Sequence, residues 1–194
     1  MVYRTGLVVS IGLSINKEPF FHVIGNIENF NNYKFKLLDV INNAPCDPPF
    51  NNEDNNYKTD YYVKNNRPYA DFLFNITYSY FSKLANELSF DPIKLHIKVS
   101  SLWFQQYKNK GTHGWHTHGD CNFTNVLYIE KPDSLHTEFY CPITKQFIYF
   151  NDIKEGSILT FPGYILHRSP KNTCDQTKTI ISFNTELTHN DTSN

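Results

Sequence analysis

The segment His116-Thr117-His118-Gly119-Asp120 places three candidate metal ligands at alternating positions. In an extended chain, side chains two residues apart point to the same face, so positions 116, 118 and 120 would share one. A lone His167 follows much later, after the turn-like Phe161-Pro162-Gly163. Two imidazoles and a carboxylate that hold one face of an octahedron, with open positions opposite, suit non-haem Fe(II).

Two ligand sets fit this pattern, and both contain His118 and His167. Asp120 completes the more usual set of two histidines and a carboxylate, and we favour it slightly. His116 is the alternative, and it would give three imidazoles, a donor set that also holds catalytic zinc. The chain has eight histidines, so a chance cluster of solvated side chains is the competing interpretation. We interpret the remaining histidines as incidental: His22, His96, His113, His136 and His189.

Composition limits the classes of protein to which this chain can belong. Its 194 residues fit one domain with a sizeable core, to which 16 Phe and 13 Tyr contribute bulk. A net charge of −1 gives no general electrostatic case for a nucleic-acid or membrane partner. The apolar run 6–15 is too short to span a bilayer. The cysteines (Cys46, Cys121, Cys141 and Cys174) form no close pair, which favours free thiols and a cytoplasmic protein.

The periodicity of apolar residues predicts the elements that must position these ligands. Residues 1–24 read as one or two strands. Helical spacing predicts helices over about 27–43 and 68–88, separated by an Asn- and Pro-rich loop at 44–68 that is either a lid or poorly ordered. Alternation then predicts a series of strands: 95–107, 126–129, 137–140, 146–150, 157–161 and 178–183.

Two helices followed by many short strands indicate an α+β, mainly β, fold in which helices buttress a jelly roll. We expect a single domain over 1–194. It would comprise an N-terminal region with the polar loop (1–68), a helix with the jelly-roll core (69–187) and a tail (188–194).

The motifs in the C-terminal half occur in an order that resembles a known protein family. Residues 70–187 resemble the small 2-oxoglutarate- and Fe(II)-dependent dioxygenases, and most of all a branch from bacterial viruses and marine bacteria that is related to prolyl hydroxylases. A viral chain of this kind would act in the host cytoplasm. The Phe-Pro…His and Ile-Ser-Phe-Asn pieces are the most specific. The matching pieces are His116-Thr117-His118, Asn125–Tyr128, Glu155–Pro162, His167 and Lys178–Asn184.

This resemblance implies a double-stranded β-helix and assigns roles to several residues. Members of that branch commonly have His-x-His at this place, which would make His116 and His118 the first two ligands. Lys178, eleven positions after His167, stands where many relatives have the Arg that anchors the C5 carboxylate of 2-oxoglutarate. Lys keeps the charge of that Arg but not its bidentate fork. Tyr128 is a weaker candidate for contact with this cosubstrate, or otherwise a core residue.

The implied activity is hydroxylation by Fe(II), O2 and 2-oxoglutarate, with release of succinate and CO2. The substrate would be peptidyl, of the prolyl type, or a small molecule, and the resemblance does not name it. Two other classes stay open: a cupin-like metalloenzyme with three histidines, and a non-catalytic jelly-roll protein that binds a partner or has a structural role.

Overall fold

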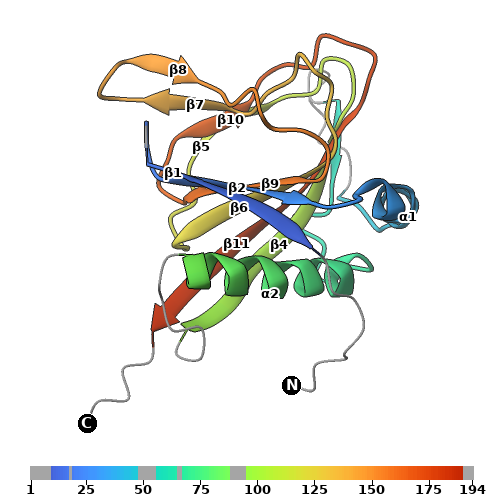
Figure 1. Cartoon of the computed structure of the whole chain (residues 1–194). Coiled ribbons are helices and arrows are strands. Elements are labelled where there is room, and N and C mark those ends of the chain that lie inside the picture. Colours follow the sequence, from blue (N-terminus) through green and yellow to red (C-terminus); the bar gives the residue numbers. More distant parts are fainter. Residues whose placement is uncertain (1–9, 18, 48–55, 65–66, 88–94, 190–194) are drawn as a thin grey trace.

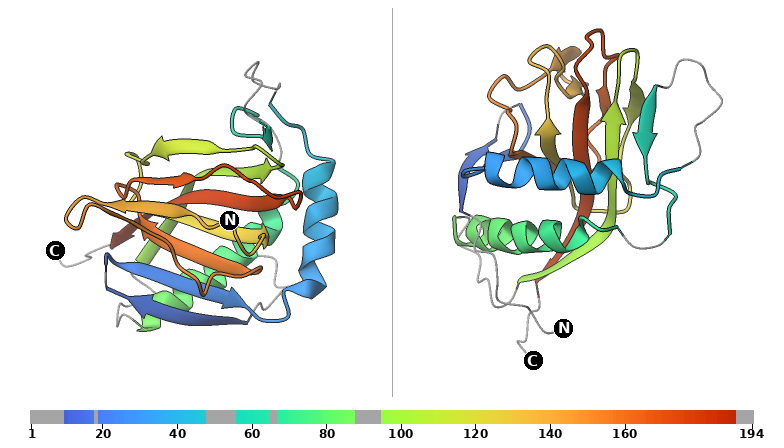
Figure 2. Two further views of the ribbon diagram at one scale, coloured as in Figure 1. Left: turned by 90° about the horizontal axis from the view of Figure 1, so that it is seen from above. Right: turned by 90° about the vertical axis from the view of Figure 1, so that its right-hand side faces the viewer.

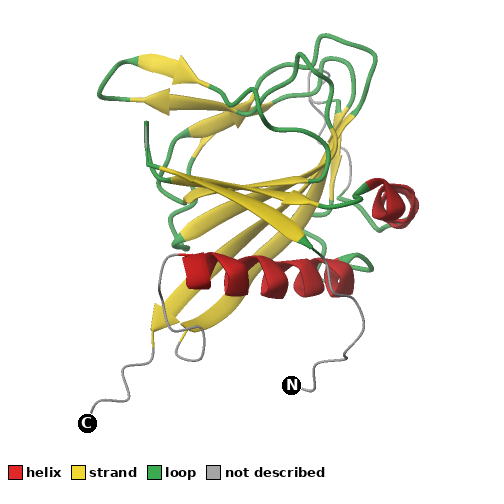
Figure 3. Cartoon of the chain, viewed as in Figure 1, coloured by secondary structure: helices red, strands yellow, loops and turns green. Residues whose placement is uncertain are grey.

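Two antiparallel sheets face each other in the computed structural model, which describes residues 10–17, 19–47, 56–64, 67–87 and 95–189 (Figures 1 and 3). The major sheet has seven strands in the order β1-β2-β9-β6-β11-β4-β3, and the minor sheet has four in the order β5-β10-β7-β8. The elements are β1 (Ile11–Asn16), β2 (His22–Ile27), α1 (Asn31–Asn42), β3 (Tyr57–Thr59), α2 (Ala70–Glu87), β4 (Leu95–Tyr107), β5 (His113–His116), β6 (Phe123–Glu130), β7 (Glu138–Cys141), β8 (Gln146–Ile148), β9 (Ser157–Pro162), β10 (His167–Ser169) and β11 (Lys178–His189).

The central strands of the major sheet are buried on both faces, and their side chains alternate between two apolar clusters. In β6, Val126 and Tyr128 point toward the minor sheet, whereas Leu127 and Ile129 point toward the helices. This alternation follows from the two-residue repeat of a strand. The face of β6 that carries Val126 and Tyr128 is therefore the face that can contribute to a site between the sheets.

The two helices support the major sheet from outside the sandwich. Helix α2 lies against the sheet face that points away from the minor sheet (Figure 1), and α1 lies along one end of the strands (Figure 2). Apolar residues at helical spacing form the buried stripe of α2. They are Leu73, Ile76, Tyr80, Phe81 and Leu84.

A chain of buried hydrogen bonds joins α2 to the middle of the major sheet. The Tyr80 hydroxyl donates to Thr160 Oγ1 at 2.8 Å, and Thr160 donates to Asn125 Oδ1 at 2.7 Å. The Asn125 amide then donates to the Phe183 carbonyl and to Thr185 Oγ1. Each buried polar group in this chain is satisfied, which avoids the cost of burying it without a partner.

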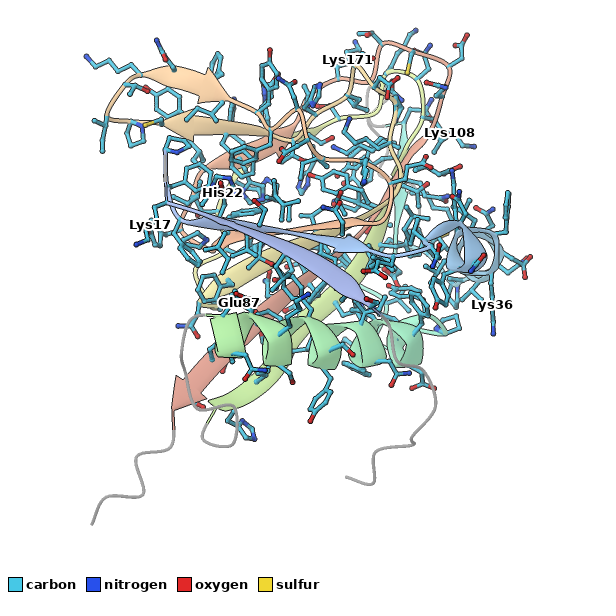
Figure 4. All side chains as sticks on the ribbon, in the orientation of Figure 1. Lys17, His22, Lys36, Glu87, Lys108 and Lys171 are labelled. Carbon is cyan, nitrogen blue, oxygen red and sulfur yellow. The ribbon has the colours of Figure 1, made fainter. Side chains whose placement is uncertain are left out.

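The minor sheet closes the sandwich over the inner face of the major sheet. His22 projects from β2 into this region (Figure 4), and its ring stacks on Phe150 with centroids 4.1 Å apart. Its Nδ1 lies 2.9 Å from the Phe20 carbonyl. His22 is therefore a buried packing residue.

The mainly β fold with two buttressing helices is confirmed, and most predicted elements occur within a few residues of their expected bounds. Helix α1 begins later than predicted because β2 extends to Ile27. The described part of the 44–68 loop contains the short strand β3, which pairs with the end of β4. One or two strands were expected over 1–24; residues 1–9 and 18 lie outside the described residues, and β1 and the first part of β2 lie in the rest of that range. Within the described part of the chain, no helix is long and apolar enough to cross a membrane.

Candidate metal centre and adjoining cavity

Three histidines converge at one place between the sheets. One possible ligand nitrogen from each of His116, His118 and His167 lies within 4.8 Å of those of the other two. Strand pairing sets up the first contact, since His116 of β5 and His167 of β10 are directly paired residues. Their ring centroids are 4.2 Å apart, and the His118 ring lies 5.1 and 5.2 Å from these two.

Backbone carbonyls fix the ring orientation of two of these histidines. His116 Nδ1 lies 2.8 Å from the Gly114 carbonyl, and His167 Nδ1 lies 2.9 Å from the Ile165 carbonyl. A carbonyl can only accept, so each Nδ1 must carry the proton and donate it. The lone pair of each Nε2 is then available for a metal, an arrangement typical of metal-binding histidines.

The third histidine, His118, lies beyond the end of β5 and is held by the chain around Gly163. Its backbone N–H donates to the Gly163 carbonyl at 2.8 Å. A Cβ atom on Gly163 would lie 2.6 Å from the His118 carbonyl oxygen. The close approach of these two segments therefore requires glycine. The side chain of His118 also contacts Asn184, whose amide nitrogen lies 3.5 Å from His118 Nδ1.

Asp120 does not join this cluster in the structure. Strand β5 ends at His116, so the strand alternation expected for positions 116, 118 and 120 does not continue through the segment. Residues 119 and 120 form a turn, and the side chain of Asp120 is exposed. Of the two ligand sets that the sequence allows, the structure brings together the three histidines.

His113, interpreted from the sequence as incidental, lies beside the three histidines. Its ring stacks on His116 with centroids 4.1 Å apart, and its Nδ1 lies 3.2 Å from the Gln105 side-chain amide. Strict alternation would place 113 and 116 on opposite faces, but the pairing of β5 with β10 is irregular. His167 pairs with His116 and Ser169 with His113, so one strand has an extra residue there. This bulge turns His113 to the side of His116, and the sequence gives no signal for it.

Lys178 is fully buried, with 0% of its surface exposed, in the same cavity as the three histidines. Its Nζ donates to Ser169 Oγ at 3.1 Å and to Thr137 Oγ1 at 3.4 Å. The rings of Tyr107 and Tyr128 lie 5.6 and 5.7 Å from this ammonium. Among the described residues, no carboxylate forms an ion pair with it. A buried charge without an opposite charge is costly, so this pocket fits an anionic ligand.

Tyr128 lies next to this pocket, behind Thr137, and does not itself line the cavity. Its hydroxyl lies 2.6 Å from Thr137 Oγ1, one of the two oxygens that contact Lys178. Ser182 and Ile180 share the face of Lys178 along β11 and also line the cavity, whereas Ile181 and Phe183 pack on the helix side. The alternation along β11 therefore places Lys178, Ile180 and Ser182 on the cavity side of the strand.

Arg168, the residue after His167, is a second basic side chain that lines the cavity. Its guanidinium forms an ion pair with Glu138 at 2.7 Å and lies 4.6 Å from the centre of the Trp115 ring. The positive charge of Arg168 is therefore already paired with Glu138 and stacked on Trp115. Lys178 is thus the basic group in this region that lacks an acidic partner among the described side chains.

Burial changes the protonation of the groups around the cavity. It lowers the pKa of His118 to about 4 and of His167 to about 3, and it also lowers the pKa of His116. The imidazoles are therefore neutral at neutral pH, the form that binds a metal. Burial likewise lowers the pKa of Lys178 to about 7, with a smaller contribution from Lys131.

Comparisons with known proteins give a structural likeness and no sequence relative. No protein-family model matches this chain, and no curated protein matches it. Its fold is similar to that of a 2OG-Fe(II) oxygenase family protein from Burkholderia pseudomallei, with a TM-score of 0.60 at 9% identity over 80% of this chain and 78% of that one.

Two further solved structures share the fold and contain ligands. The first is the epimerase SnoN in complex with Fe3+, alpha ketoglutarate and nogalamycin RO (TM-score 0.61, 10% identity, 89% of this chain and 82% of that one). The second is the 2OG complex of the viral collagen prolyl hydroxylase from Paramecium Bursaria Chlorella virus-1 (TM-score 0.53, 16% identity, 84% and 94%). At these identities the likeness establishes the fold alone, a mainly β fold of two facing sheets like that of these oxygenase structures.

Proposed function

We propose that this protein is a 2-oxoglutarate- and Fe(II)-dependent oxygenase in which His116, His118 and His167 bind the iron. The observation that carries the proposal is the joint presence, in one cavity, of three neutral imidazoles and a buried ammonium without an acidic partner among the described residues. The imidazoles fit a divalent metal, and the ammonium fits the distal carboxylate of a dicarboxylic cosubstrate. The fold shared with oxygenases of this class supports the same assignment.

The side chains of this chain would bind and orient the reactants. When bound, the iron would supply the activation of O2 and the transfer of oxygen to substrate, coupled to conversion of 2-oxoglutarate to succinate and CO2. Lys178 would hold one carboxylate of 2-oxoglutarate, with hydroxyls of Ser169 and Thr137 beside it. The apolar rings of Tyr107 and Tyr128 would exclude water from that end of the cavity.

We propose hydroxylation as the reaction type, with a peptidyl substrate of the prolyl type or a small molecule as the acceptor. Trp103 and His113 line the cavity beside the three histidines and would contact such a substrate. Likeness to the viral collagen prolyl hydroxylase supports the peptidyl choice. Candidate proline-containing peptides and free amino acids are the substrates to test first.

The direct test measures succinate formed from 2-oxoglutarate by the Fe(II)-loaded protein, with and without candidate substrates. We expect His167→Ala to abolish both iron binding and succinate formation, because two remaining imidazoles hold Fe(II) weakly. His96→Ala is a matched control, since His96 is an exposed residue of β4 far along the strand from Trp103. Full iron stoichiometry in folded His167→Ala protein would refute the metal site.

A cupin-like metalloenzyme is the second candidate, and the donor set itself favours it. Three histidines without a carboxylate are also the ligands of catalytic zinc. Such a protein would retain zinc through purification, and its activity would not depend on 2-oxoglutarate. Metal analysis together with the succinate assay separates the two candidates.

A further inference from the structure

Three aromatic rings form a continuous chain from His118 to the protein surface. The Trp103 ring lies 5.6 Å from the His118 ring, centroid to centroid. Tyr61 packs edge-on against Trp103 at 5.2 Å, and Tyr62 packs edge-on against Tyr61 at 4.9 Å. Trp103 is only 3% exposed, whereas Tyr61 and Tyr62 are 50% and 66% exposed.

Hydrogen bonds hold the two tyrosines in this position. The backbone N–H of Tyr62 donates to both oxygens of the Asp47 carboxylate at 3.0 and 3.1 Å, and the N–H of Tyr61 donates to Thr59 Oγ1 at 3.2 Å. Thr59 in turn belongs to β3, which pairs with β4, the strand that carries Trp103. The turn after β3 is therefore fixed to the strand of Trp103, although its aromatic rings remain half exposed.

Tryptophan and tyrosine are the aromatic side chains that give up an electron most readily, and rings in contact exchange electrons quickly. We propose that Trp103, Tyr61 and Tyr62 form a relay that carries oxidising equivalents from the metal centre to the surface when O2 is activated with no substrate bound. This inference rests on the proposed iron-dependent function. In this role, the three rings protect the ligands His116, His118 and His167 from oxidation.

Each step of the relay moves one electron toward the metal centre. The indole of Trp103 gives one electron to the oxidised metal centre and its ring N–H proton to water in the cavity. Tyr61 then reduces Trp103, which takes back a proton, and Tyr62 reduces Tyr61 in the same way. A thiol or ascorbate in solution finally supplies one electron and one proton to the exposed Tyr62. The net change is one electron gained by the metal centre, one proton gained by water in the cavity, and one electron and one proton lost by the soluble reductant.

The other tryptophan of the chain provides a natural comparison. Trp115 is the sequence neighbour of His116, but its ring stacks on Phe147 and lies 4.6 Å from the Arg168 guanidinium carbon. That positive charge disfavours removal of an electron from the indole. Trp115 is therefore the same type of residue as Trp103 but does not lie in the relay.

The test maps oxidation in four Fe(II)-loaded proteins: wild type, Trp103→Phe, Tyr61→Phe and Trp115→Phe. One arm supplies 2-oxoglutarate and O2 without other substrate, and a second supplies hydrogen peroxide without 2-oxoglutarate. Peptide mass spectrometry locates the oxidised residues, and electron paramagnetic resonance detects tyrosyl radicals. Omission of ascorbate and thiols allows oxidation to accumulate.

We expect oxidation of wild type and of Trp115→Phe to concentrate on Tyr61 and Tyr62. In Trp103→Phe the tyrosyl signal should fall several-fold and oxidation should move to the histidines of the metal centre. In Tyr61→Phe oxidation should stop at Trp103, and this variant, altered at a half-exposed position, tests the relay even if Trp103→Phe does not fold. The relay would be overturned if Tyr61 is oxidised equally in wild type and Trp103→Phe. It would also be overturned if neither Tyr61 nor Tyr62 is oxidised in either arm.

The two arms separate failure of the relay from failure of the proposed function. Relay oxidation with peroxide, but neither succinate nor oxidation with 2-oxoglutarate, supports the relay and rejects 2-oxoglutarate as the cosubstrate. Succinate formation with the same oxidation pattern in all four proteins supports the oxygenase function and rejects the relay.

Discussion

His116 and His167 are directly paired residues of the neighbouring strands β5 and β10, and their ring centroids lie 4.2 Å apart. This pair of possible ligands is set by backbone hydrogen bonding and not by a loop. Sites on paired strands are held more precisely than sites on loops. His118, in the segment after β5, needs separate support, and the contact with Gly163 supplies it.

We expect His116→Ala to weaken iron binding far more than Asp120→Ala. His116 belongs to the group of three imidazoles, whereas Asp120 lies exposed in the following turn. Loss of a ligand should exceed the roughly 10- to 100-fold cost of losing an outer hydrogen-bond partner. Anaerobic Fe(II) titration of both variants measures the difference. The reverse ranking would mean that the turn rearranges around the metal and that Asp120 is the third ligand.

Gly163→Ala should weaken metal binding through His118. The added methyl group would lie 2.6 Å from the His118 carbonyl oxygen and 2.8 Å from Cys121 Sγ, so the segment that carries His118 must move. Gly119→Ala is the matched control, because a Cβ there meets no atom within 4 Å. Co(II) titration, followed by its visible absorption, reports both affinity and ligand geometry. Equal affinities for the two variants would show that the position of His118 does not depend on this contact.

The sequence predicted the elements whose apolar pattern is long and regular. Helix α2 buries one side of a regular repeat, and apolar residues alternate along strand β4, so their residues reveal both type and approximate bounds. The face of Lys178 was also predictable, because β11 alternates between Lys178, Ile180 and Ser182 on the cavity side and Ile181 and Phe183 on the other.

Short or irregular elements were not predictable in the same way. Strands β3 and β10 have three residues each and, unlike the equally short β8 within the predicted 146–150 strand, their segments (Tyr-Lys-Thr and His-Arg-Ser) show no apolar alternation. The placement of His113 beside His116 depends on a bulge that arises from pairing with β10, a contact between residues far apart in the sequence. The end of β5 at His116 likewise depends on contacts between distant residues. Because the strand stops there, alternation does not place Asp120 on the same face as His118.

The hydrogen bonds between α2 and the major sheet should contribute measurably to stability. Tyr80→Phe removes the donor to Thr160 and should lower the free energy of unfolding by about 1 kcal/mol. Asn125→Leu leaves Thr160, Thr185 and the Phe183 carbonyl each short of a buried partner, so a loss of about 3 kcal/mol or more is expected. Urea denaturation of the metal-free proteins measures both changes. Similar small losses would indicate that water replaces the Asn125 amide.

Lys178→Ala should raise the dissociation constant of 2-oxoglutarate far more than that of the metal. A hydrogen bond between charged groups contributes roughly 1.5–3 kcal/mol, which corresponds to about a 10- to 150-fold change in affinity. Lys178→Arg should recover part of this, since it restores the charge. Calorimetric titration of 2-oxoglutarate into metal-loaded protein compares the three forms. Unchanged affinity in Lys178→Ala would remove Lys178 from the cosubstrate site.

The affinity for 2-oxoglutarate should depend on pH through Lys178. Burial, with a smaller contribution from Lys131 and an opposing one from Glu138, lowers the pKa of this ammonium to about 7 in the ligand-free protein. Only the protonated form pairs with a carboxylate, so bound 2-oxoglutarate raises this pKa and binding takes up a proton above pH 7. The affinity should therefore be constant below about pH 7 and fall by about tenfold for each pH unit above it.

Titrations between pH 6 and 9, with Mn(II) as a redox-stable metal, test this dependence. Lys178→Arg is the matched control, because a guanidinium remains charged throughout this range and any residual slope in that variant belongs to other groups, such as water on the metal. A wild-type affinity that follows the same curve as Lys178→Arg would show that Lys178 stays protonated across the range or does not contact the cosubstrate. A steeper fall in wild type alone, beginning near pH 7, is the expected result.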